Sequence, residues 1–358
     1  MLALTKAGFQ TGNKNTMANI NLTSADLKGA LVGGLINEDV MKKISDISEV
    51  PLPFTNMVGS ATAKNEKIEW TLDKLATPDL TNAVVDGSDA VGDDTVVGTR
   101  VANHHQISDK IVKVSYRADA SDTIGRAKEL GYQLSRRQNE LKRDVEAISL
   151  SNQASVADNG DTVAGKAGGL PSWLETSSYG GVGHAAGGFD TGTGLTVGRT
   201  VGTAAALSVQ TVKDAVESVY NEGGESSVFM SVPGVVSKFT DFLFTSDARI
   251  ATLQADQGKS SGAITANGAI NTYITDFGKL DIVANRIQQP YGTTTADAFI
   301  LDPSYLELCY LKGYRADPLA KTGLAENRQL SVDWTLIVKT EAAQAMIGDI
   351  DYSLDAIA

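Results

Sequence analysis

The sequence predicts an α+β fold, and two patterns along its 358 residues favour this class. Apolar and polar residues alternate in several short segments, which is typical of strands with one buried face. In other segments the apolar residues recur at spacings of three, four and seven, which is typical of amphipathic helices. In the second half of the chain, helices and strands of mixed length follow one another, and this order indicates a unit with a central sheet.

Two short helices are expected between Met17 and Val50, because Thr23 and Asn37 are suitable N-cap residues. Pro51 and Pro53 should stop any helix that reaches them. The helical region is therefore expected to end near residue 50, where the character of the sequence changes.

The next region is expected to form a protruding hairpin. Two alternating segments, Glu66–Leu72 and Lys110–Tyr116, predict strands that are separated by about forty residues. The stretch from Asp73 to Thr95 between them is acidic, with six aspartates against one lysine. Because a long polar segment carries no core of its own, we expect that a neighbour must hold this hairpin.

The strongest helical pattern runs from Ser121 to Asn152 and predicts a helix of about thirty residues, some 45 Å long at about 1.5 Å per residue. Its apolar stripe consists of Ile124, Ala127, Leu130, Leu134, Leu141, Val145 and Ile148. Six basic residues are balanced by five acidic ones, so a solvated face with salt bridges is favoured over a nucleic-acid contact.

Residues 159–203 contain 13 of the 35 glycines and few charges, which indicates an extended insertion or loop rather than a packed domain. Only the segment Gly168–Leu174 is expected to be anchored, through its residues Leu170, Trp173 and Leu174.

Regular structure resumes at Ser208, which is a suitable cap for a helix that ends at Gly223 and Gly224. Further elements are then expected in the order strand, helix, strand pair, strand, helix and strand, at residues 227–232, 233–244, 271–285, 298–302, 304–311 and 331–340. The last strand should return to pair with an early strand, because an amphipathic strand is not stable alone.

The sequence nominates no catalytic, cofactor-binding or metal-binding residue. Gly160, Gly165 and Lys166 have the spacing of a phosphate-binding loop, but Ala167 replaces the hydroxyl residue and the preceding segment is polar. The histidines at positions 104, 105 and 184 are expected to be polar residues of the surface or of loops, and Cys309 to be a buried, inert thiol. The formal net charge of −12 argues against tight, nonspecific binding of DNA, and no segment is apolar enough to span a membrane.

The C-terminal third contains five short features whose order is informative. They are the pair Asn285–Arg286 after a strand, the strand end Ile300–Pro303, the apolar segment Ser304–Leu311, the segment Leu319–Gly323 and the alternating strand Val332–Val338. In this order, over about seventy residues, they resemble the end of the major head proteins of tailed bacteriophages, which have the Hong Kong 97-like capsid fold.

This resemblance implies a particular division of the chain. It comprises an N-terminal arm (1–50), an extended loop (51–106), a peripheral domain (107–207) with a spine helix (121–152) and a glycine-rich insertion (159–203), an axial domain (208–320), and a return to the peripheral domain (321–358).

The resemblance also implies a structural function. Copies of the chain would form hexamers and pentamers that tile an icosahedral shell around double-stranded DNA, without tight binding of that DNA. Contacts to portal, scaffold or decoration proteins and assembly in the host cytoplasm are expected too. Trp70 and Leu72 are the candidate interface residues, and the alternative is that they pair across their own hairpin. The other readings are an enzyme with an unrecognised site in the axial-like domain, or a tail-tube or decoration protein.

Overall fold

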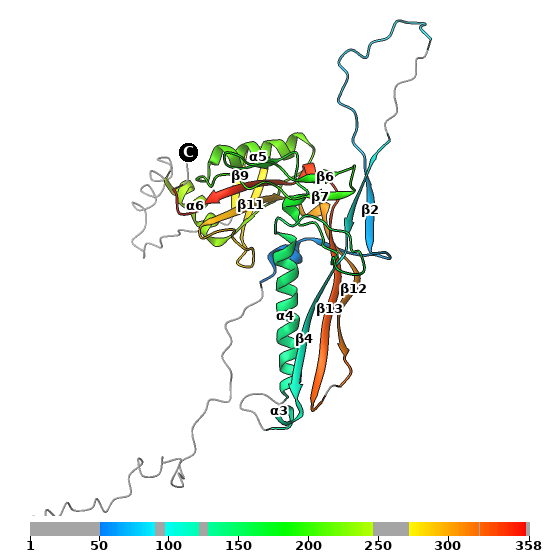
Figure 1. Ribbon diagram of the computed structural model, residues 1–358. Helices are drawn as coiled ribbons and strands as arrows, with labels where there is room; N and C mark the ends of the chain where they lie inside the picture. Colours follow the sequence, from blue (N-terminus) through cyan, green and yellow to red (C-terminus); the bar gives the residue numbers. More distant parts are fainter. Residues whose placement is uncertain (1–50, 90–96, 122–127, 246–271, 322, 356–358) are drawn as a thin grey trace, which may run out of the picture. The chain divides into compact units, whose positions relative to one another are not determined.

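The computed structural model describes residues 51–89, 97–121, 128–245, 272–321 and 323–355, except the side chains of 242–245 (Figure 1). All of them fall in one of the two compact units into which the chain divides. The two helices expected near Thr23 and Asn37 lie outside the described residues.

The first sheet has four strands in the order β1 (Gly59–Thr62), β12 (Leu306–Pro318), β13 (Ala325–Val338) and β4 (Gln106–Ser115). β1 runs parallel to β12, and the other pairs are antiparallel. The predicted return of the last alternating segment to an early strand is confirmed, because β13 pairs with β4 from Ala325 to Trp334. The predicted burial of Val332, Trp334, Leu336 and Val338 is confirmed, but burial does not alternate to the end of the strand, because Thr335 and Ile337 are buried as well.

One helix, α4 (Glu129–Ser149), packs along β4 and β13 (Figure 1). The expected span of 121–152 is wrong, because Ser121 and Lys128 both have extended backbone, with ψ angles of 142° and 125°. Ser121 instead ends a short helix, α3 (Tyr116–Ala120). The described part of the apolar stripe is confirmed: Leu141 and Val145 are buried, and Leu130, Leu134 and Ile148 are partly buried against the core.

The second sheet has six strands. Their order is β5 (Ser178–Tyr179), β14 (Ala345–Asp351), β11 (Thr295–Leu301), β8 (Val228–Ser231), β10 (Gly278–Ala284) and β9 (Thr272–Thr275). Helices α5 (Val209–Asn221) and α6 (Pro233–Thr245) share a hydrophobic cluster with this sheet. Both helices, the hairpin β9–β10 and the positions of Ser208 and Gly223 at the ends of α5 agree with the sequence prediction.

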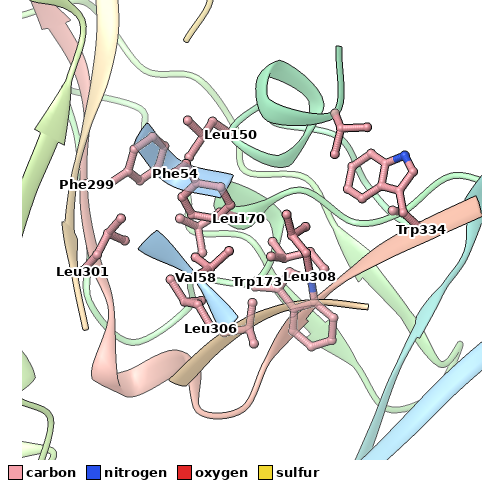
Figure 2. Close-up of a cluster of buried hydrophobic side chains, with 14 of the residues drawn as sticks. Phe54, Val58, Leu150, Leu170, Trp173, Phe299, Leu301, Leu306, Leu308 and Trp334 are labelled. Carbon is pink, nitrogen blue, oxygen red and sulfur yellow. The ribbon is translucent and has the colours of Figure 1, made fainter. Parts of the chain in front are cut away.

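The six-stranded sheet contributes to two hydrophobic cores. Phe229 and Ile300 face the helices, whereas Phe299 and Leu301 belong to the core of the four-stranded sheet. Figure 2 shows the core of the four-stranded sheet, in which side chains of β11 and β12 meet those of the glycine-rich segment, including Trp173.

Residues 304–311 form part of a strand, so the expected helix there is wrong. Leu306 and Leu308 are buried within β12, which pairs on one side with β1 and on the other with β13. A short apolar run fits a buried strand as well as a helix, and here pairing on both edges stabilises the strand. β12 therefore belongs to the four-stranded sheet, whereas β14 belongs to the six-stranded sheet. The expected boundary between residues 320 and 321 thus does not separate the two sheets.

The remaining elements are short. They are α2 (Pro53–Met57), β2 (Lys67–Leu72), β3 (Thr99–His104), β6 (Gly188–Asp190), β7 (Leu195–Val197) and three 3₁₀ turns at Leu170–Ser172, Pro303–Tyr305 and Glu341–Ala343. Pro53 begins α2 rather than stopping a helix, which is consistent with the tolerance of the first helical turn for proline.

Candidate interaction surface

Strands β2 and β3 form a hairpin, with Lys67 opposite His104 at one end and Leu72 opposite Thr99 at the other. The first predicted strand is confirmed in β2, but its partner β3 was not predicted, and the second predicted strand lies in β4, which pairs with β13 instead. Residues 73–89, here called the acidic arm, follow β2 without helix or strand and are all exposed (Figure 1). Its large apolar side chains are no exception, since Leu75 is 94% and Leu80 97% exposed. As the sequence predicts, the arm has no core of its own.

Trp70 packs against an aromatic stack that the sequence did not predict. Its ring lies 5.3 Å from that of Trp173, which in turn stacks on Phe189 at 5.7 Å with an angle of 5° between the planes. Trp70 also faces Val101 across the hairpin, and Leu72 faces Thr99. Both candidate residues are only partly buried against the core, so their role as interface residues stays a prediction.

A basic pocket opens beside the hairpin, with a volume of about 530 Å³. It is lined by Thr62, Ala63, Lys64, Asn65, Lys67, Ile68, Glu69 and Arg100. Lys67 Nζ lies 3.0 Å from one oxygen of Glu69, and Arg100 binds the other. The hydrogen bond from Lys67 and the charge of Arg100 lower the pKa of Glu69 against the opposing effect of burial, so the carboxylate is held in its ionised form. Three cations against one carboxylate leave the pocket positively charged.

A buried carboxylate fastens α2 to α4. Glu146 is fully buried, and its Oε1 accepts hydrogen bonds from the backbone N–H of Phe54 at 2.8 Å and from Asn285 Nδ2 at 2.9 Å. Its Oε2 accepts from the backbone N–H and the hydroxyl of Thr55, at 2.7 and 2.6 Å. One side chain thus satisfies the first amides of α2 and ties three distant segments together.

Replacement of Glu146 by leucine is expected to lower the free energy of unfolding by about 3 kcal/mol, because it leaves the amides of Phe54 and Asn285 buried without an acceptor. Denaturant unfolding of the unassembled chain would measure this free energy. Glu140→Leu is the control on the same helix: Glu140 pairs with Arg136 and Arg137 at the surface, so we expect a change of less than about 0.5 kcal/mol. Equal losses of stability in the two variants would contradict the role of Glu146 in joining α2 to α4.

A second buried polar cluster holds the glycine-rich segment. Arg199, whose side chain is fully buried, donates to Asp297 Oδ1 at 2.7 Å and to Asp349 Oδ1 at 3.0 Å. The hydroxyl of Tyr291 lies 2.9 Å from both of these oxygens. Burial raises the pKa of Asp297. Burial also acts to raise the pKa of Asp349, but the hydrogen bonds and the charge of Arg199, together with the hydrogen bonds from Gly202 and Tyr291, outweigh it and lower this pKa.

The backbone of the glycine-rich segment completes this cluster. The N–H groups of Gly181 and Gly202 donate to Asp349 Oδ2 at 3.2 and 3.0 Å. A Cβ atom at position 181 would lie 1.7 Å from the carbonyl oxygen of Thr203, so only glycine fits there. Residues 159–203 are mostly loop, as predicted, and the predicted burial of Leu170, Trp173 and Leu174 is confirmed. The expectation that only Gly168–Leu174 is anchored is wrong, because Gly181, Arg199 and Gly202 are also held.

Sequence patterns did not predict either buried cluster. Glu146, Arg199 and Asp349 are charged residues in segments without a motif, and their partners lie far away along the chain. The one signal in the sequence that could have indicated the second cluster is Arg199, the one arginine in a glycine-rich segment with few charges.

The structure gives no support to a phosphate-binding loop. Lys166 forms an antiparallel bridge with Val156, and only a 3₁₀ turn at Leu170–Ser172 follows. The described residues hold no group of three or more potential metal ligands, and none of the described helices is long and apolar enough to cross a membrane.

The expectation of a surface position is wrong for His105, whereas His184 lies in a loop between β5 and β6, as expected. His105 is buried, with Nδ1 3.4 Å from Asp333 Oδ1, and burial lowers its pKa. The side chain of His184 is 9% exposed and lies 3.0 Å from the hydroxyl of Ser178. Cys309 is buried as expected, and burial raises the pKa of its thiol.

Comparison with known proteins gives a family match over nearly the whole chain. The model of the family described as SU10 major capsid protein matches residues 8–351. The major capsid protein of Escherichia phage Phieco32 is 39% identical over 111 residues, which are 31% of this chain and 32% of that protein. The chain thus matches about a third of the length of this relative.

Solved structures with a similar fold cover most of the chain at low identity. That of Gordonia phage Cozz has a TM-score of 0.55 at 13% identity and covers 99% of this chain and 100% of its own. The capsid of a native GTA particle has a TM-score of 0.56 at 14% identity, with 89% and 97% covered. The holo-SrpI encapsulin complex from Synechococcus elongatus PCC 7942 has a TM-score of 0.52 at 10% identity, with 90% and 95% covered. These likenesses confirm the expected Hong Kong 97-like α+β fold.

Proposed function

Because the chain belongs to the SU10 major capsid protein family, we propose that its copies assemble into hexamers and pentamers that tile an icosahedral shell around double-stranded phage DNA. The observation that carries the assembly step is the acidic arm. Leu75, Leu80 and their apolar neighbours Val84 and Val85 are 78% to 97% exposed in the isolated chain. Covering each such side chain stabilises an assembly by about 1.5–3 kcal/mol, so a neighbouring copy is the natural cover.

The domain roles follow from the sheets rather than from sequence boundaries. We assign the four-stranded sheet with α4 to the peripheral domain, and the six-stranded sheet with α5 and α6 to the axial domain. The hairpin β2–β3 with the acidic arm is the extended loop, and residues 1–50 are the N-terminal arm. Under this assignment the chain reaches the peripheral domain with β12 and returns to the axial domain with β14.

Trp70 and Leu72 remain our candidate interface residues. The core buries only part of each side chain, and both lie on the strand that leads into the acidic arm. A neighbouring copy that covers the arm would also contact β2. The alternative, pairing across their own hairpin, is compatible with the register and is tested by the tryptophan variants below.

The remaining expectations concern partners and chemistry. A formal net charge of −12 suits a shell that encloses DNA without binding it tightly. We propose a structural role without enzymatic activity or cofactor, formation of the shell in the host cytoplasm, and contacts to portal, scaffold or decoration proteins. Family membership favours this role over a tail-tube or decoration protein.

Replacement of residues 74–97 by a short Gly-Ser turn tests the proposal. We expect the fold to be kept, because the removed described residues are exposed, but closed particles to be lost. Sedimentation velocity would measure the particle fraction, and circular dichroism the fold. A matched control replaces the exposed turn 159–163 in the same way. Particles that form normally without the arm would show that the arm does not hold the shell together.

A further inference from the structure

The basic pocket is unusual on this chain, because three cationic side chains converge on one hollow of a protein whose formal net charge is −12. Lys67 and Arg100 are partly neutralised by Glu69 between them. Lys64 pairs with no carboxylate of the described residues and is exposed. The pocket therefore presents positive charge to solvent in a place where an acidic partner would fit.

The acidic arm has the complementary character. It carries four aspartates and a single lysine, and that lysine, Lys74, pairs with Glu222, the residue that follows α5. Its aspartates are exposed, as are Leu75 and Leu80. The arm thus combines unneutralised negative charge with apolar side chains that have no cover within the described part of the chain.

We propose that the acidic arm of one copy docks in the basic pocket of a second copy. The inference rests on the proposed function, since it names the partner surface for one contact of the assembly. Charge complementarity would orient the arm and select its register, and burial of the arm's leucines would supply most of the affinity.

The exposure of the arm favours a second copy over the pocket of the same chain. The arm leaves the hairpin at the Leu72 end of β2, where Arg100 of the pocket lies opposite Thr71, whereas Lys64 and Lys67 lie at or beyond the opposite end. No residue of the arm lines the pocket, and Leu75 and Leu80 are 94% and 97% exposed. The arm of the same chain therefore leaves both the pocket and its own leucines uncovered.

Charge reversal on each side provides the test. The pocket variant is Lys64→Glu with Arg100→Glu, and the arm variant is Asp86→Lys with Asp89→Lys. Asp79 is left intact because it accepts two hydrogen bonds from Thr81 that shape the arm. The control for surface charge is Lys113→Glu with Lys166→Glu, at exposed positions outside both surfaces.

Each single-sided variant is expected to lower the assembled fraction in sedimentation by about tenfold or more, because like charges then face each other. The control variant should assemble as the unmodified chain does. A chain that carries both sets of substitutions restores opposite charges and should regain assembly.

Mixing the pocket variant with the arm variant separates the two possible geometries. Between unlike copies each arm again meets a pocket of opposite charge, so the mixture should assemble even though neither variant does alone. No rescue in the mixture, but rescue in the combined chain, would show that the arm docks in its own pocket and would overturn the proposal.

Two further outcomes would also overturn it. Normal assembly of both single-sided variants would mean that this contact is not used. The proposed function would still hold in that case, because the unmodified chain assembles. Failure of the combined chain as well as the mixture would mean that the pocket takes another partner, such as a nucleic-acid phosphate. If the unmodified chain does not assemble at all, the proposed function fails before this test begins.

Discussion

Replacement of Arg199 by methionine is expected to lower the free energy of unfolding by about 3–5 kcal/mol. Arg199 is the cation that binds both Asp297 and Asp349, and all three side chains are at least 93% buried. Methionine fills a similar volume but leaves two buried carboxylates without a positive partner. The measurement is denaturant unfolding of the soluble protein.

The same variant should expose the glycine-rich segment. Gly181 and Gly202 are fastened to Asp349, so their amides should exchange hydrogen faster once this carboxylate is no longer held by Arg199. Lys279→Met provides the control, because Lys279 pairs with Asp281 at the surface and should change stability by less than about 1 kcal/mol. Unchanged stability in Arg199→Met would show that the cluster does not secure this segment.

Replacement of Trp173 by alanine is expected to cost about 3–5 kcal/mol of stability, as for other large buried aromatic residues. Trp173 is 2% exposed and stacks between Trp70 of the hairpin and Phe189 of the glycine-rich segment. Its loss removes the support on which β2 rests. Thermal unfolding of the soluble protein would measure the change.

Trp70→Ala is the matched variant and tests the interface prediction. Because Trp70 is only partly buried, we expect a smaller loss of stability in the single chain but a clear loss of assembled particles. If Trp70→Ala lowers stability as much as Trp173→Ala and leaves the particle yield of the folded fraction unchanged, Trp70 serves the fold of its own chain and not an interface.

The sequence predicts the elements whose pattern is local. Helix α5 and strand β13 were identifiable because apolar residues recur at a regular period in each, such as Val212, Ala215, Val216 and Val219 in α5. Strand β12 was not, because the run from Ser304 to Leu311 is apolar on both faces and its conformation depends on β1, which lies far away in the sequence. The conformation of this run is set by strand pairing and not by the period of its apolar residues.

The buried polar sites were unpredictable for a related reason. Arg199 meets Asp297 and Asp349 across 98 and 150 residues of chain, and Glu146 meets Phe54 across 92. No spacing rule connects residues at such distances. Trp70 was predicted to lie at an interface or to pair across its own hairpin, and neither alternative includes Trp173. The contact between the two rings depends on how the glycine-rich segment folds back, which the sequence pattern did not show.

The central claim is that this chain builds a closed shell from copies of itself, and the most direct test is to express the full chain alone and examine it by sedimentation and negative-stain electron microscopy. The account predicts closed shells or rings of the size of hexamers and pentamers. A compact monomer that persists at high concentration, and after addition of the other head proteins of the same phage, would contradict it.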